Sequence, residues 1–156
     1  PDYSYHFFAF LFYDLLHAIS IPAPHRHKFE PSWEYANYMA LSNEMDATPF
    51  FNLYRNCGWY VDSLVGSIVG ELEHKGLLDN SILVITGDHS QEFNENKKNY
   101  WGHGSNYSDA QIHVPFIYYE PGQAPRNYHH TTTHYDIVPT LMHTFFGVSN
   151  PPGDYS

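Results

Sequence analysis

Two pairs of acidic and imidazole side chains stand directly after apolar runs of the sequence. Asp14 and His17 follow the first run, and Asp88 and His89 follow the second. Carboxylates and imidazoles bind divalent metal ions, and histidine also exchanges protons near neutral pH. Metal binding or acid–base chemistry is therefore the first function to consider.

Asp88 and His89 are adjacent, so on a regular strand their side chains would point to opposite faces. A tight turn at Gly87 would let both reach one ion. A carboxylate with an imidazole favours Zn²⁺ or Mn²⁺, while Mg²⁺ or Ca²⁺ stays possible. Because a catalytic metal takes at least three protein ligands, others must come from elsewhere. The alternative is structural, with Asp88 capping a turn and His89 a surface imidazole.

Three apolar runs predict strands, at residues 7–13, 81–86 and 114–119. The first two lack alternation, which is typical of strands buried on both faces of a parallel sheet. Such sheets bind ligands beyond the carboxyl ends of their strands, which would bring the two acidic–imidazole pairs to one edge.

Two helices complete the predicted α/β order of elements. Thr48 and Pro49 predict the start of a long helix, with Thr48 as N-cap, and Gly76 ends it. A last helix is predicted from Ile137 to Phe146, capped by Asp136.

The composition excludes several classes of function. The 156 residues carry 7 basic and 17 acidic side chains, for a net charge of −10, so neither nucleic acid nor an anionic membrane surface would attract the chain directly. The 42% of hydrophobic residues can build a core, which excludes general disorder. Cys57 is the single cysteine and cannot form an internal disulfide.

Several stretches together resemble the sulfatase and alkaline-phosphatase superfamily, in particular the sulfatase-like domain of YejM-type inner-membrane proteins. They are GLLDNSILVITGDH at 76–89, EFNEN at 92–96, YWGHGSN at 100–106, HYDIVPTL at 134–141 and NPPGDYS at 150–156. The resemblance implies a three-layer α/β/α fold with a mainly parallel sheet. The chain, 1–156, would then be the C-terminal portion of such a domain.

The resemblance also implies roles for individual residues. Asp88 and His89 match paired metal ligands of the family. His17 matches a histidine that faces the substrate in sulfatases, and His103 matches one that approaches the phosphate or head group in related transferases. Asp136 matches a helix-starting residue of structural importance.

Three features depart from the family pattern. Ser90 replaces the usual glycine after Asp-His, which would strain a turn that needs a positive φ. His113 stands where relatives often carry arginine. The nucleophile and the remaining metal ligands would lie in an N-terminal part outside this chain, so we expect the chain to be inactive alone.

Other polar and aromatic residues have structural explanations. Glu92 either orients His89 or is a solvated loop charge, and the second is favoured. The imidazoles of His129, His130 and His134 fit a flexible polar loop better than a metal cluster. Trp101 and Cys57 are expected to pack in the core.

Two functions follow from these residues and the resemblance. One is metal-dependent hydrolysis or transfer at a phosphate or sulfate ester. The other is a non-catalytic lipid-binding or regulatory role, in cardiolipin or lipopolysaccharide homeostasis, with a degenerate metal site. Either would place the chain in the periplasm, on a bacterial inner-membrane protein whose anchor lies outside this chain. Its partners would be an ester or lipid head group and the missing part of its own domain.

Overall fold

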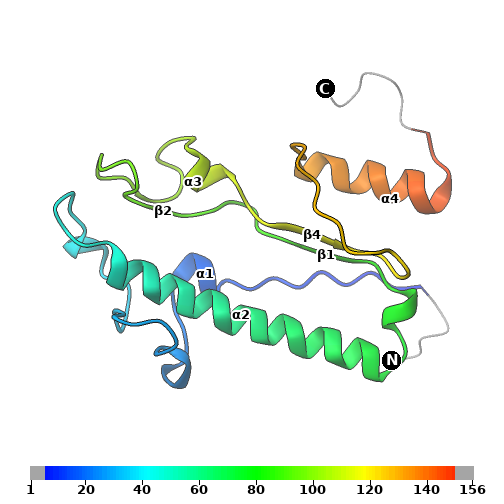
Figure 1. Ribbon diagram of the computed structural model, residues 1–156, viewed down its shortest axis with the longest axis horizontal. Helices are drawn as coiled ribbons and strands as arrows, with labels where there is room; N and C mark the ends of the chain where they lie inside the picture. The colour runs from blue at the N-terminus through cyan, green and yellow to red at the C-terminus, as the bar shows by residue number, and fades with distance from the viewer. Residues whose placement is uncertain (1–5, 150–156) are drawn as a thin grey trace. The chain divides into compact units, whose positions relative to one another are not determined.

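A 27-residue helix, α2 (Thr48–His74), is the longest element of the structure (Figure 1). The structure is a computed structural model that describes residues 6–149, so the 150–156 motif lies outside the described part. The chain divides into two compact units, Pro1–Gln123 and Ala124–Ser156. The larger unit also holds α1 (Leu15–Ala18), α3 (Asp109–Ile112), β1 (Leu83–Thr86), β2 (Glu92–Phe93), β3 (Trp101–Gly102) and β4 (Phe116–Tyr119).

The ends of α2 follow from the sequence. Pro49 stands in the first turn, and the Asp46 carboxylate accepts the backbone N–H of Thr48 at 2.9 Å. Ala47 rather than Thr48 is the N-cap, a shift of one residue from the prediction. At the other end, Gly76 has a φ of +65°, a left-handed conformation that glycine adopts without a steric cost, and its N–H donates to the Glu73 carbonyl.

The hydrophobic core lies along the first half of α2. Phe50, Leu53 and Cys57 are buried there, and Tyr54 packs against them. The remaining buried apolar residues come from the segment after α1 and from β2: Ile19, Ile21 and Phe93. The predictions that Cys57 belongs to the core and that Trp101 packs against it are confirmed. Further along α2, Leu64, Ile68 and Leu72 are only half-buried.

The strands pair in two small antiparallel sheets among the described residues. β1 pairs with β4, with Leu83 opposite Tyr119 and Thr86 opposite Phe116. β2 pairs with β3 in the second sheet. The predicted mainly parallel sheet does not appear, because a continuous apolar run reports burial and carries no information on strand direction.

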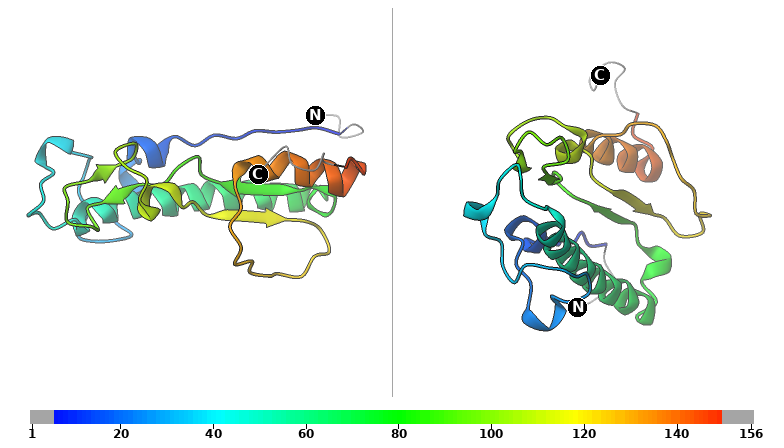
Figure 2. Two further views of the ribbon diagram at one scale, coloured as in Figure 1. Left: turned by 90° about the horizontal axis from the view of Figure 1, so that it is seen from above. Right: turned by 60° about the vertical axis from the view of Figure 1, so that its left-hand side comes forward.

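The predicted strand at residues 7–13 is not formed in the structure. Figures 1 and 2 show this segment as an extended trace with no strand assigned. Its side chains are largely exposed, at 88% for Phe8 and 77% for Phe10. A strand requires a neighbour to accept and donate its backbone hydrogen bonds, and the described residues place no paired strand beside this one.

The smaller unit contains α4 (Ile137–Phe146) after a 3₁₀ turn at His134–Asp136. The predicted helix is confirmed, and Gly147 ends it with a φ of +64°. Asp136 is the N-cap by position, but its carboxylate accepts the backbone N–H of Thr133 at 2.6 Å, so it closes the preceding turn.

The first prediction compares two leucines of α2. Leu53→Ala should lower the free energy of unfolding by about 2–5 kcal/mol, since it empties a fully buried site. Leu72→Ala, on the half-buried part of the same helix, should cost clearly less. Urea unfolding of both variants measures the difference, and equal losses would place the core elsewhere.

Candidate functional site

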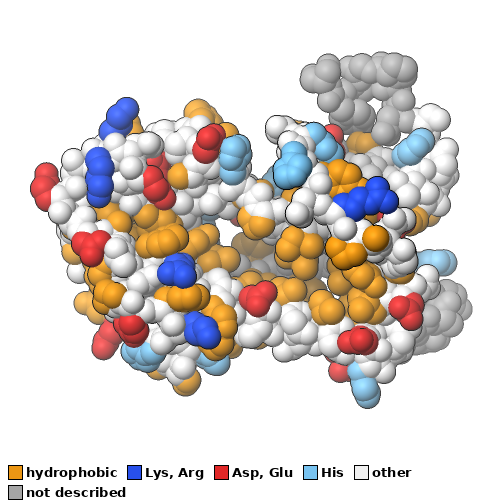
Figure 3. Space-filling model, in the orientation of Figure 1, with side chains coloured by type: hydrophobic (Ala, Val, Ile, Leu, Met, Phe, Trp, Pro, Cys, Tyr) orange, Lys and Arg blue, Asp and Glu red, His pale blue; other side chains and the backbone are white. Residues whose placement is uncertain are grey.

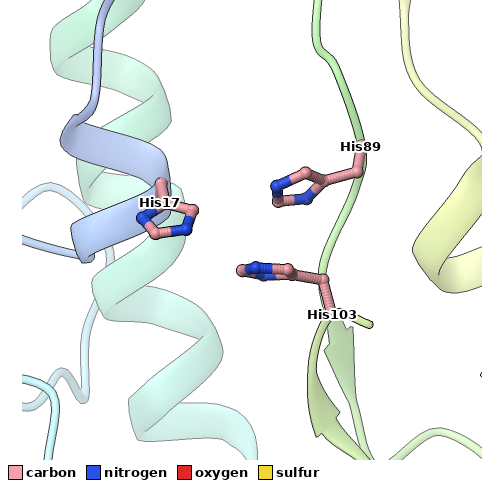
Figure 4. A group of neighbouring side chains, drawn as sticks. All are labelled: His17, His89 and His103. Carbon is pink, nitrogen blue, oxygen red and sulfur yellow. The ribbon is translucent and has the colours of Figure 1, made fainter. Parts of the chain in front are cut away.

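Three imidazoles from separate parts of the larger unit converge (Figure 4). His17 lies on α1, His89 follows β1, and His103 follows β3. One ring nitrogen of each lies within 4.8 Å of the others. The rings of His89 and His103 stack with centroids 3.9 Å apart, and the His17 centroid is 4.9 Å from that of His103. Residues predicted separately from the sequence therefore form one group.

The Nδ1 atom of each ring lies near an oxygen. The contacts are His17 with Asp14 Oδ1 at 3.5 Å, His89 with the Ser90 carbonyl at 3.1 Å and His103 with Gln91 Oε1 at 3.2 Å. Because carbonyl oxygens only accept hydrogen bonds, the contacts of His89 and His103 require a proton on Nδ1. In the neutral ring the proton then sits on Nδ1, and the lone pair of Nε2 is available to a ligand.

The surroundings of His103 favour its neutral form. Burial lowers the pKa of its imidazole, the neighbouring His89 and His17 lower it further, and Asp88 opposes them. A neutral imidazole is the form that binds a cation or accepts a proton.

Asp88 lies beside this group. Its Oδ2 is 3.8 Å from Nε2 of His89, and its Oδ1 accepts the backbone N–H of His89 at 3.0 Å. A Cβ at Gly87 would come within 3.3 Å of the His89 carbonyl and 3.5 Å of the Val114 side chain, so a side chain there would crowd the turn. Asp88 itself is 74% exposed.

The donor set fits a transition-metal ion. Three imidazole nitrogens with one carboxylate nearby are typical of Zn²⁺ sites and suit Mn²⁺ less well, whereas Mg²⁺ and Ca²⁺ prefer oxygen ligands. In addition, Nδ1 of His89 and Nδ1 of His103 lie within hydrogen-bond distance of an oxygen, a contact that metal-bound histidines usually make.

Glu92 organises the loop that carries His103. Its side chain is fully buried, so the expectation of a solvated loop charge is wrong, and its hydrogen bonds go to residues of the loop and α3 rather than to His89. Burial alone would raise the pKa of its carboxyl, but hydrogen bonds together lower it. Their donors are Asn106 and Gln111, both at 2.8 Å, and Ser108 and Asn96, both at 3.0 Å.

Both sides of the site rest on the first half of α2. The Phe93 ring, next to Glu92, packs against Phe50 and Phe51 with centroids 5.4 and 5.0 Å apart. On the other side, Leu16 of α1 packs on the same core, beside Gly58. One helix therefore positions His17 and the loop of His103.

The remaining predicted features lie as follows. Ser90 is not among the described residues with a positive φ, so the expected strain is absent, and its N–H donates to the Gln111 carbonyl at 2.8 Å. His113 is an exposed side chain outside the group, 3.8 Å from Asp109. The described part of the chain shows no metal-binding group at His129, His130 and His134.

Sequence reasoning did not identify Gln91 as a neighbour of the site. Gln91 lies in the sequence between the Asp88-His89 pair and Glu92, and its residue type alone does not indicate a role. It comes close to His103 only through the β2–β3 pairing. By contrast, the glycines flanking His103 did mark it, and both have positive φ, at +82° for Gly102 and +77° for Gly104.

Comparison with known families identifies the family of the chain. The Sulfatase family model matches residues 6–148, so the chain belongs to the sulfatase family. Membership supports the α/β, alkaline-phosphatase-like class expected from the sequence. No solved structure matches the chain significantly.

Individual relatives match at modest identity. The chain is 24% identical over 107 residues to inner membrane protein YejM of Salmonella typhimurium, covering 69% of the chain and 17% of that protein. It is 32% identical over 113 residues to the lipoteichoic acid synthase-like YvgJ of Bacillus subtilis, covering 66% and 18%. Human iduronate 2-sulfatase is 34% identical over 64 residues, covering 41% and 11%. The chain thus spans less than a fifth of the length of these relatives. Among its described helices, none has the length and apolarity that crossing a bilayer requires.

The second prediction concerns acid stability. Because the pKa of Glu92 is lower in the fold than its ordinary value of 4.5, the carboxylate stabilises the fold above that value. This contribution is lost as pH falls through the folded pKa. Glu92→Gln should therefore cost about 1–3 kcal/mol near neutral pH and flatten the loss of stability in acid.

Urea unfolding at a series of pH values from neutral to acid measures this effect. Glu34→Gln, a change at an exposed acid, is the matched control and should follow the wild-type profile. A Glu92→Gln profile parallel to wild type would contradict the role of the buried carboxylate.

Proposed function

We propose that the chain contributes to metal-dependent hydrolysis or transfer at a phosphate or sulfate ester, as part of a sulfatase-like domain. The observation that carries this proposal is the convergence of His17, His89 and His103 with each Nδ1 against an oxygen. Such a group presents several lone pairs to one point, which suits a cation. Membership of the sulfatase family adds the reaction class.

The residues divide between cation binding and charge stabilisation. His89 and His103 would hold the ion with Asp88, and the bound ion would supply Lewis-acid polarisation of the ester. The lowered pKa of His103 favours its neutral ring, which suits cation binding better than the approach to a phosphate or head group that the resemblance implies. His17 is the group we assign to a developing negative charge, on the side of the cluster where the Asp14 carboxylate lies 3.5 Å from its Nδ1.

The whole domain supplies what this chain does not. We expect the nucleophile and further metal ligands on an N-terminal part. Strands of that part would pair with residues 7–13 in the mainly parallel sheet of a three-layer α/β/α fold. The exposed phenylalanines of that segment support such pairing. A phosphate or sulfate ester, or a lipid head group, is the expected substrate. The expected location is the periplasmic side of a bacterial inner membrane, because relatives include an inner membrane protein.

A second candidate is a regulatory domain that binds a lipid head group without catalysis. The exposure of Asp88 favours it, because a carboxylate that is 74% exposed and already accepts the His89 N–H is not held ready as a ligand. In this alternative the imidazoles would recognise an anionic group, in cardiolipin or lipopolysaccharide homeostasis.

The third prediction tests metal binding. Calorimetric titration of the purified protein with Zn²⁺ should show one site at neutral pH. His89→Ala or His103→Ala should weaken it by more than about 100-fold, since loss of outer contacts alone costs about 10–100-fold. His113→Ala, outside the group, is the matched control and should bind as wild type. Equal binding by all variants would contradict the site.

The fourth prediction separates the two functions. The whole protein that contains this chain should hydrolyse p-nitrophenyl phosphate or p-nitrophenyl sulfate, and chelation by EDTA or His89→Ala should abolish the activity. Metal binding without ester cleavage would instead support the regulatory function. Hydrolysis that survives both EDTA and His89→Ala would contradict the proposed site.

A further inference from the structure

We propose that Gln91 is a positioning residue that fixes the proton of His103 on Nδ1 and so presents the Nε2 lone pair to the metal or proton. This inference rests on the proposed function, since it assigns a purpose to the lone pair. Gln91 would act through His103 and touches no reacting group itself.

The position of the Gln91 side chain is tightly defined. It is 7% exposed, and its Oε1 lies 3.2 Å from Nδ1 of His103. A Cβ built on Gly102 would stand 3.6 Å from the same oxygen, so Gln91 Oε1 lies close to the backbone just before His103. Gly102 has a φ of +82°, a left-handed conformation that glycine adopts without a steric cost.

The backbone on both sides of Gln91 is also fixed. Before it, the Ser90 N–H donates to the Gln111 carbonyl at 2.8 Å. After it, Glu92 pairs with Gly102 in the β2–β3 ladder, and its carboxylate is held by the four side-chain donors. These contacts fix the backbone that carries the Gln91 amide on both sides.

This placement decides which nitrogen of His103 carries the proton. A free neutral imidazole exchanges its proton between the two nitrogens, and only one form presents Nε2 as an acceptor. An amide oxygen cannot donate, so its contact selects the form with the proton on Nδ1. A reversed amide would place its NH₂ against Nδ1 and select the opposite form. The two arrangements predict opposite tautomers.

The Nδ1 contacts of His17 and His89 differ from this one in kind. His17 uses a neighbouring carboxylate, and His89 uses the carbonyl of the next residue in the chain. Only His103 depends on a side-chain amide twelve residues away. Substitution of Gln91 therefore tests one imidazole of the group without altering the contacts of the other two.

The direct test is the tautomer of His103 in the metal-free purified protein. Nitrogen-15 NMR of histidine-labelled protein, above the pKa of the ring, should show a protonated Nδ1 in wild type. Gln91→Met, of similar size but without an acceptor, should shift the proton toward Nε2. Gln91→Glu, which keeps an acceptor oxygen, should retain the wild-type signature. Gln123→Met, at an exposed glutamine, is the control for the chemical change.

Titration with Zn²⁺ alone gives the second readout. Gln91→Met should weaken binding by about 10–100-fold, and Gln91→Glu should restore it to within a few-fold of wild type. Loss of binding in both variants, with unchanged tautomers, would show a merely structural role and overturn the proposal. If wild type binds no Zn²⁺, the proposed metal site fails, whereas the tautomer still decides the role of Gln91.

The wild-type spectrum is decisive even if a variant does not fold. A proton on Nε2 of His103 in wild type would overturn the proposal, because Gln91 would then be donating to the ring. Thermal unfolding of each variant shows whether its spectrum reports on folded protein.

Discussion

A carboxylate removed from water without a cation must be surrounded by hydrogen-bond donors. The part of the larger unit that carries His103 is arranged to meet this requirement. Among the described residues, Glu92 forms no ion pair, and its donors come from Asn96, Asn106, Ser108 and Gln111. To meet one carboxylate, the chain between β2 and α3 must fold back on itself. That closure sets the β2–β3 pairing, and through it the place of His103 beside Gln91. Hydrogen bonds to one buried carboxylate thus fix the conformation of this segment, as hydrophobic packing does in the core. Figure 3 shows how much of the apolar side-chain area stays at the surface.

The second constraint is the shared helix. His17 and His103 come from distant parts of the sequence, and the segment that carries each has a side chain that packs on the first half of α2. Leu16 does this for α1, and Phe93 does it for the loop. The separation of the imidazoles therefore depends on the packing around Phe50, Leu53 and Cys57 rather than on contacts between the rings. This division leaves the imidazoles free to bind a ligand while their supports stay rigid.

Much of this arrangement could be predicted from the sequence, for identifiable reasons. Spacing and caps predicted α2 and α4 closely, because the signals for a helix are local. His103 was marked by its flanking glycines, and the turn at Gly87 was expected from the adjacency of Asp88 and His89. Strand direction could not be predicted, because the apolar runs at 81–86 and 114–119 look the same in either orientation. The environment of Glu92 was predicted wrongly, since an acid in an Asn-rich stretch looks solvated until its four donors are brought together. Residues 7–13 show the remaining limit, because a strand is defined by its neighbour as much as by its own composition.

The uneven burial of α2 has a consequence for how substitutions combine. In the first half of the helix, Phe50 and Leu53 belong to one buried cluster, so two changes there share surroundings and their effects on stability will not add. In the second half, Leu64, Ile68 and Leu72 are half-buried and lie outside that cluster. Changes there are independent of changes in the first half and will add to them. In the first half of α2, substitutions must therefore be compatible with one another and with the imidazole site that the helix supports. In the second half, each position can change independently.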